Sequence, residues 1–258
     1  MSRRPNTDER RAQIVAGLLA VMAKHGYDGA SIADIAAKAR LVPGLVHYHF
    51  ASKLEILVEA TLVLAADHER VLDRAVAGAR NASEALAAIV DVHLGLGAHA
   101  DPERLACWIQ IAGEAIRHPQ VRAEFRTVIA SLARRIENLI DRGIDDSELA
   151  CDAPAAAGAA ITATIEGYFV MAATARDVIP HGSAAACTTR MLGALVQPAT
   201  GTRSGARSGA RSGTRSGTRS GTRSTTRSTT RAATRSSTRA ATRSSTRSRT
   251  RSGSRRAR

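Results

Sequence analysis

The sequence has few of the residues on which several common classes of protein depend. It contains only three cysteines, Cys107, Cys151 and Cys187, which lie far apart and form no C-x-x-C pair. This pattern argues against a disulfide framework or a cysteine zinc site and suits a reducing cytoplasm. A Ser-His-Asp ordering, a glycine-rich phosphate loop and an H-E-x-x-H zinc motif are also missing from the sequence. We therefore expect neither an enzyme nor a bound cofactor.

Long hydrophobic runs are scarce as well. The first apolar run, from Ile14 to Ala23, is short and no cleavage pattern follows it, so it is not a convincing signal peptide. The longest weakly polar stretch, 153–175, consists mostly of Ala, Gly and Thr and carries Glu166 in its middle. A central carboxylate opposes membrane insertion. We expect no membrane partner, and we interpret this stretch as a helix buried against another protein surface.

Acidic and large apolar residues are absent from the C-terminal part of the chain. Residues 201–258 contain 17 of the 37 Lys and Arg residues and no Asp or Glu, so residues 1–200 carry a net charge of −3 although the whole chain carries +14. Arginine recurs at every fourth position from 203 to 247, and a helix would stack these like charges. We expect 199–258 to be a disordered tail. It is either attracted to nucleic acid or a tolerated product of repeat expansion or an altered reading frame.

The rest of the chain is long enough to bury a substantial core and has the pattern of helices throughout. Four prolines, at 43, 102, 119 and 154, each stand at the start of an apolar-periodic run, where a missing N–H costs little. No alternating stretch is long enough to predict a strand. The signals predict a first helix capped by Thr7 and stopped by Gly26, and later helices over 52–79, 83–97 (beginning at Ser83), 101–117, 119–142 (ended by Gly143), 153–176 and 183–196.

The most informative stretch runs from Ser31 to Phe50. Ser31 with Asp34 three residues later is a capping box, which begins a helix. After a tight turn, Pro43 begins a second short helix in which Val46 and Phe50 point inward, while Gly44, Leu45, His47 and Tyr48 face outward. Two short helices, a tight turn and a small shared core are typical of a helix-turn-helix motif.

Lys53 follows this motif, at the start of the next helix. Ser52 and Glu55 form a second capping box there, and Lys53 takes the first helical position, where a cation meets the positive end of the helix dipole. Stability alone would favour an acid at that position. We therefore predict that Lys53 lies at a phosphate site.

The run Ile35-Ala36 … Val46-His47-Tyr48-His49-Phe50 … Ser52-Lys53 resembles the DNA-binding region of the tetracycline-repressor (TetR) family of bacterial regulators. Residues 114–122 resemble the effector domains of its betaine-regulator-like members. The resemblance implies an all-α fold of about nine helices and a homodimer joined by the last two of them. It also implies a small-molecule pocket, a recognition helix in the major groove of operator DNA, and phosphate contacts from Tyr48 and Lys53.

The motif and the resemblance together predict one set of DNA-binding residues, which comprises Ser31, Pro43, Gly44, Leu45, His47, Tyr48, His49 and Lys53. The chain departs from the family where glycine is usual, at Arg40, and where a serine cap is usual, at Val42. A left-handed conformation strains Arg40 by roughly 1 kcal/mol. His47 and His49 do not make a good metal pair, because residues two apart on a helix point to different sides.

The predicted domains are a helix-turn-helix domain over 8–68, a ligand-binding and dimerisation domain over 69–198, and the tail over 199–258. The candidate pocket residues, each of which could instead be ordinary core, are His93, Trp108, Phe125, Tyr168, Phe169 and Met171. Glu166 has two interpretations. It pairs with a group of the second subunit across a dimer seam within 153–196, or it contacts the ligand.

These features predict a cytoplasmic, nucleoid-associated and sequence-specific DNA-binding regulator, and a repressor released by a small molecule is the default for this family. The alternatives are a non-specific architectural nucleic-acid-binding protein acting through its tail, and an enzyme on a helical scaffold.

Overall fold

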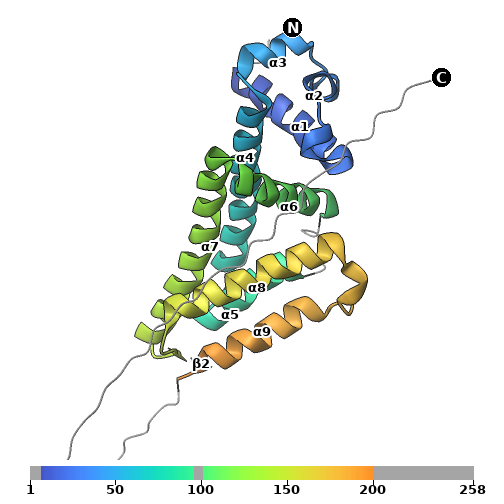
Figure 1. Ribbon diagram of the computed structural model, residues 1–258. Helices are drawn as coiled ribbons and strands as arrows, with labels where there is room; N and C mark the ends of the chain where they lie inside the picture. The colour runs from blue at the N-terminus through green and yellow to red at the C-terminus, as the bar shows by residue number, and fades with distance from the viewer. Residues whose placement is uncertain (1–6, 96–100, 200–258) are drawn as a thin grey trace, which may run out of the picture. The chain divides into compact units, whose positions relative to one another are not determined.

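The computed structural model of the chain describes residues 7–95 and 101–199. The predicted tail from residue 200, and the end of the helix predicted over 83–97, lie outside these residues. Within them the chain forms nine α-helices, which Figure 1 shows: α1 (Thr7–Gly29), α2 (Ile32–Ala39), α3 (Pro43–His49), α4 (Lys53–Ala77), α5 (Ala82–Leu94), α6 (Pro102–Arg117), α7 (Pro119–Asp145), α8 (Pro154–Thr174) and α9 (Ser183–Leu195). The predicted all-α fold is confirmed.

Two short elements were not predicted. A single 3₁₀ turn, η1 (Arg176–Val178), follows α8, and β1 (Leu149–Ala150) pairs antiparallel with β2 (Gln197–Pro198). Strands of two residues are too short to show a period-2 alternation in the sequence. The pair ties the end of α9 back to the segment after α7.

Some helix ends differ from the prediction. The cap of α5 is Asn81, whose side chain accepts a hydrogen bond from the Glu84 N–H at 2.8 Å, so the helix begins before Ser83. Gly143 does not end α7, which continues to Asp145. A Cβ at Gly143 would lie 2.4 Å from Cδ1 of Leu149, so glycine is required there by packing and not by the backbone. At Gly26, by contrast, φ is 75° and the regular helix does stop.

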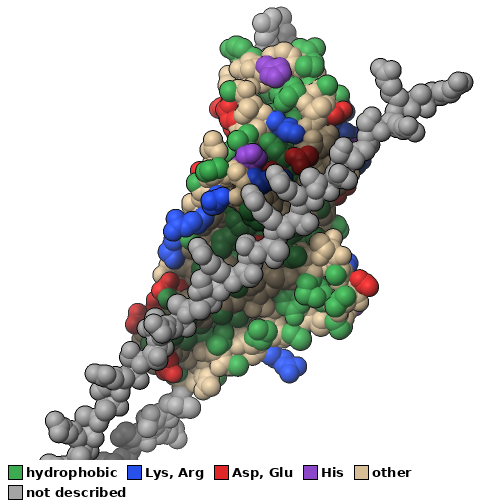
Figure 2. All heavy atoms as spheres, viewed as in Figure 1, with side chains coloured by type: hydrophobic (Ala, Val, Ile, Leu, Met, Phe, Trp, Pro, Cys, Tyr) green, Lys and Arg blue, Asp and Glu red, His purple; other side chains and the backbone are tan. Residues whose placement is uncertain are grey.

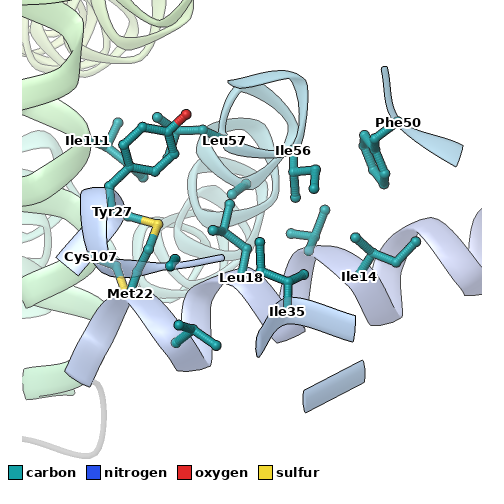
Figure 3. Packing of buried hydrophobic residues seen from close by; sticks show 14 of the residues in the cluster. Ile14, Leu18, Met22, Tyr27, Ile35, Phe50, Ile56, Leu57, Cys107 and Ile111 are labelled. Atoms are coloured by element: carbon teal, nitrogen blue, oxygen red, sulfur yellow. The ribbon is translucent and has the colours of Figure 1, made fainter. Parts of the chain in front are cut away.

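The first hydrophobic core joins the helix-turn-helix region to α6. Leu18 and Met22 of α1 are fully buried and pack with residues of α4. Figure 3 shows Cys107 and Ile111 of α6 beside Met22 and Tyr27. Cys107 is buried.

The second core lies among α5, α7, α8, α9 and the later part of α4. Its buried residues begin on α4 at Leu72 and include Ile89, Ile136, Ile161 and Leu192. Because α4 contributes to both cores, it is a continuous structural link between them.

Candidate DNA-binding surface and ligand cavity

The start of α2 is held by the capping box that the sequence predicted. Ser31 Oγ accepts from the Asp34 N–H at 3.1 Å, and Asp34 Oδ2 accepts from the Ser31 N–H at 3.2 Å. Hydrogen bonds from the Ser31 hydroxyl and backbone lower the pKa of Asp34. The Ser31 side chain therefore fixes where the motif begins.

The turn between α2 and α3 contains both departures from the family pattern. Arg40 has φ 58° and ψ 42°, the left-handed conformation that costs a non-glycine residue about 1 kcal/mol. Val42 stands at the cap of α3 and makes no side-chain hydrogen bond to it. The turn still forms because the Leu41 N–H donates to Ala36 O at 2.8 Å.

Helix α3 presents a polar and sterically open outer face. Val46 is buried and Phe50 is 2% exposed, as predicted, whereas Tyr48 is 79% exposed. Pro43, Gly44 and His47 are also exposed, and Leu45 and His49 are half-buried. A Cβ placed on Gly44 would meet no heavy atom within 4 Å.

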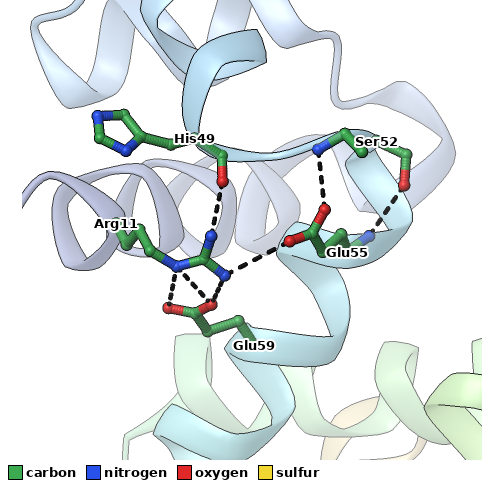
Figure 4. A network of polar contacts seen from close by, with 6 residues as sticks. Arg11, His49, Ser52, Glu55 and Glu59 are labelled. Carbon is green, nitrogen blue, oxygen red and sulfur yellow. Dashed lines mark hydrogen bonds and ion pairs between the residues drawn. The ribbon is translucent and has the colours of Figure 1, made fainter. Parts of the chain in front are cut away.

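The inner side of α3 is anchored by an ionic network that the sequence did not reveal. Arg11 of α1 donates from Nη1 to the backbone oxygen of His49 at 2.6 Å and forms an ion pair with Glu59 of α4. Its guanidinium also lies 4.0 Å from the centre of the Phe50 ring. Figure 4 shows the contacts of Arg11 with His49 and Glu59 together with Glu55, which accepts from the Ala51 N–H at 2.8 Å. The network holds the end of α3 against α1 and α4.

Lys53 has a structural partner that its position in the sequence did not indicate. Its Nζ donates to Tyr27 O at 2.8 Å and to Ala30 O at 3.0 Å, and lies 4.3 Å from the centre of the Tyr27 ring. These carbonyls follow the break at Gly26, so the ammonium binds backbone acceptors between the regular part of α1 and the start of α2. In this structure the Lys53 donors serve these carbonyls, and the phosphate contact of Lys53 stays a prediction.

A cavity of about 440 Å³ lies among α4, α5, α6, α7 and α8. Of the predicted pocket residues, His93, Trp108, Tyr168 and Phe169 line it. Phe125 and Met171 do not belong to its lining, which corrects the prediction for both.

The physical reasons for these two corrections differ. The Phe125 ring lies 4.9 Å from that of Trp108 and packs against the first core, so its contacts are with that core and with Trp108. Met171 is on an exposed face of α8.

Two histidines meet in the cavity wall. The Nε2 atoms of His68 and His93 are 2.9 Å apart, and His93 Nδ1 lies 2.7 Å from Ile89 O. Since a carbonyl can only accept, His93 carries its proton on Nδ1 and accepts from His68 on Nε2. Burial and the neighbouring His68 lower the pKa of His93 to about 3, so this ring is neutral at physiological pH.

Glu166 reaches the same cavity from α8. Its Oε2 accepts from Trp108 Nε1 of α6 at 3.1 Å, and burial raises its pKa. Its partner thus lies in the same chain. This position is the one that the ligand-contact interpretation of Glu166 requires, and both interpretations stay predictions.

Helix α6 borders both the cavity and the helix-turn-helix region. Trp108 lines the cavity, and the preceding residue, Cys107, donates from Sγ to Leu19 O of α1 at 3.4 Å. Gln110 Nε2 donates to Met22 O of α1 at 3.1 Å. A displacement of α6 by a ligand would therefore act directly on α1.

The outer faces of α8 and α9 are rich in small and apolar residues. Val170 on α8 and Met191 and Leu195 on α9 are exposed, and Figure 2 shows hydrophobic side chains over these helices. By length and composition alone, α8 could cross a membrane. Of its most apolar 18-residue stretch, 28% is buried inside the protein. The exposed remainder of α8 is an apolar surface that nothing in the described part of the chain covers.

Comparison with known families agrees with this geometry. The family described as "Bacterial regulatory proteins, tetR family" matches residues 14–60, which contain α2 and α3, and the one described as "BetI-type transcriptional repressor, C-terminal" matches residues 82–197. The chain belongs to the TetR family. Its C-terminal match is to the BetI type, so the resemblance noted in the sequence is confirmed for both regions.

Curated relatives and solved structures are consistent with membership of the TetR family. The regulator BetI of Agrobacterium fabrum is 32% identical over 44% of this chain and 54% of its own length, so the match spans about half of that relative. BetI of Brucella suis is 24% identical over 69% of this chain and 86% of its own length.

Two solved structures share the fold. A TetR regulator from Haloarcula marismortui has a TM-score of 0.67 at 17% identity, covering 74% of this chain and all of its own. A regulator from Saccharomonospora viridis in complex with choline has a TM-score of 0.59 at 24% identity, covering 72% of this chain and 95% of its own.

Proposed function

We propose that this TetR-family chain is a sequence-specific DNA-binding regulator in the cytoplasm, which acts as a repressor until a small molecule releases it from its operator. One observation carries the proposal: the exposed outer face of α3 on a helix whose inner side is anchored by Arg11. A helix held in this way is suited to enter the major groove as a rigid unit.

The residues of α3 divide into two roles. Leu45 can contact a thymine methyl group, and His47 can donate to guanine or a phosphate, so these two side chains determine base preference. Tyr48 contacts phosphate through its exposed hydroxyl, which adds affinity without sequence information. Ser31 and His49 position the motif.

The functional unit is a homodimer joined through 153–196. The alanines and glycines on the outer face of α8 permit close helix approach, and the apolar side chains of Val170, Met191 and Leu195 supply area for burial. Two recognition helices in one dimer then match operator half-sites about one helical turn apart.

Release of the operator depends on the cavity beside α6. A ligand that binds better when α6 is displaced shifts the population toward that state, in proportion to its difference in affinity between the two states. The choline bound by the Saccharomonospora viridis regulator supports a small-molecule site in proteins of this fold. The contacts of Cys107 and Gln110 with α1 would carry the displacement to the DNA-binding surface.

A second candidate function rests on the arginines of residues 201–258. Seventeen arginines without an acidic residue would bind DNA phosphates whatever the base sequence. The logarithm of the affinity would then fall with the logarithm of the salt concentration, with a slope of about 0.9 per phosphate neutralised. This segment would then add non-specific affinity to the specific binding by α3.

The proposal is tested by selecting DNA from a random library with the full-length protein. We expect enrichment of a self-complementary site. Replacing Leu45 or His47 by Ala should change the enriched sequence, whereas Tyr48→Phe should weaken binding and leave the sequence unchanged. Enrichment of no sequence, or the same preference after both Ala replacements, would refute base reading by α3.

A further inference from the structure

The cavity beside α6 has a distinctive balance of charge. Three carboxylates line it, and two have partners that hold them: Glu69 Oε2 is 2.5 Å from Arg135 Nη2, and Asp101 Oδ1 accepts the Glu103 and Arg104 N–H groups at 2.9 and 3.1 Å. Glu166 is the third. Its hydrogen-bond partner is the neutral Trp108 indole, and no Lys or Arg within the described ranges pairs with it.

Positive charge in the lining is confined to exposed side chains. Arg104 and Arg176 belong to the lining but are exposed to solvent, and Arg104 Nη2 is 3.2 Å from Asp67 Oδ2. The His68–His93 hydrogen bond needs His93 as an acceptor, so His93 brings no charge to the wall. Among the lining carboxylates of the described residues, Glu166 is therefore the one that neither an Arg nor backbone N–H groups hold.

Aromatic rings line the same cavity as this carboxylate, and one of them, Trp108, contacts it. Trp108 comes from α6, and Tyr168 and Phe169 come from the turn of α8 that follows Glu166. The face of an aromatic ring attracts a cation, most strongly in a site removed from water. The site therefore combines several aromatic rings with a carboxylate that has no cationic partner. Such a site favours a positively charged group of a ligand and disfavours a negatively charged one.

The size of the cavity adds a second constraint. About 440 Å³ is within the range of cavities that hold drug-sized molecules, and much of the lining is aliphatic, including Leu64, Leu72, Ile129 and Leu132. A cation the size of tetramethylammonium would leave most of this apolar wall without contacts. The wall favours a ligand with an apolar body attached to its charge.

We infer that the cavity binds an amphiphilic organic monocation, whose ammonium group contacts Glu166 and the ring of Trp108 and whose apolar body lies along α4 and α7. This inference rests on the proposed function, because it names the class of effector for the same regulator.

The test uses three probes with one apolar body and different charge: 4-phenylbutylamine, 4-phenylbutan-1-ol and 4-phenylbutyrate. Calorimetry on the full-length protein at neutral pH should show the amine binding about ten-fold more tightly than the alcohol, a difference of about 1.4 kcal/mol, and the carboxylate weakest. Tetramethylammonium, which has the charge without the body, should bind more weakly than the amine.

Glu166→Gln is the decisive variant, because glutamine can still accept the Trp108 hydrogen bond while its charge is gone. It should lower amine affinity about ten-fold and leave alcohol affinity nearly unchanged. Glu124→Gln, at a half-buried glutamate of α7 that does not line the cavity, is the matched control and should behave like the wild type. Thermal unfolding of each variant establishes that it is folded.

Equal binding of the three probes, tighter binding of the carboxylate, no measurable binding of the amine, or an unchanged amine preference in Glu166→Gln would overturn the inference. DNA selection by the ligand-free protein is a separate measurement. Specific DNA binding without amine binding would refute the ligand class alone, and amine binding without specific DNA binding would refute the proposed regulator alone.

Discussion

Gly44 offers a direct test of how closely α3 approaches DNA. In the free protein a Cβ at this position would have no heavy atom within 4 Å, so packing does not require glycine there. Replacing a helical Gly by Ala stabilises a helix by at most about 1 kcal/mol, and Gly44 lies in the first turn of α3 after Pro43, where the gain is smaller. For a folded region of this size, a gain of 1 kcal/mol in the free energy of unfolding corresponds to a rise in Tm of about 2–4 °C. We expect Gly44→Ala to raise Tm slightly.

Its effect on DNA binding should have the opposite sign. If the backbone of α3 lies against the groove wall, the added methyl group meets DNA, and affinity for the selected site should fall about ten-fold. Gly113→Ala is the matched control, because Gly113 is an exposed glycine of α6 with equally open space. It should raise Tm without changing DNA affinity. Thermal unfolding and fluorescence anisotropy measure both quantities, and unchanged affinity in Gly44→Ala would refute the close approach.

Four further predictions concern other parts of the chain. Arg40→Gly should raise the free energy of unfolding by about 1 kcal/mol in chemical denaturation, because it relieves the left-handed strain; no gain would mean that Arg40 makes a compensating contact. Ala160→Glu should yield monomers in analytical ultracentrifugation, whereas Ala123→Glu on the exposed face of α7 should leave dimers; dimers in both would place the seam elsewhere. A protein ending at Pro198 should bind random DNA far less tightly than the full chain at low salt, and the difference should shrink as salt rises; equal affinities would assign the tail no role. Because the folded pKa of Glu166 is raised, the wild type should lose stability as pH rises above the ordinary glutamate value of about 4.3, so the Tm advantage of Glu166→Gln should grow between acid and neutral pH. An advantage independent of pH would contradict this assignment.

Local signals accounted for most of the fold. The helices and the helix-turn-helix motif were predictable because caps such as Ser31 and Asp34 act within three residues, and because the repeat of apolar side chains reveals the buried face of each helix. The same spacing predicted that Val46 and Phe50 are buried while Tyr48 is exposed. The left-handed turn at Arg40 was predictable only through the family resemblance.

Only the tertiary structure decided which distant groups meet. Arg11 contacts the His49 carbonyl 38 residues away, Lys53 contacts the Tyr27 carbonyl 26 residues away, and Trp108 and Glu166 are 58 residues apart. No local pattern encodes such pairs, because they depend on how helices cross and on which carbonyls are left without partners at helix ends. The sequence by itself determined the elements and their exposed faces. Packing decided that Lys53 contacts the Tyr27 carbonyl, that Phe125 packs on Trp108, and that Glu166 lines a cavity, since each depends on the separation of helices in space.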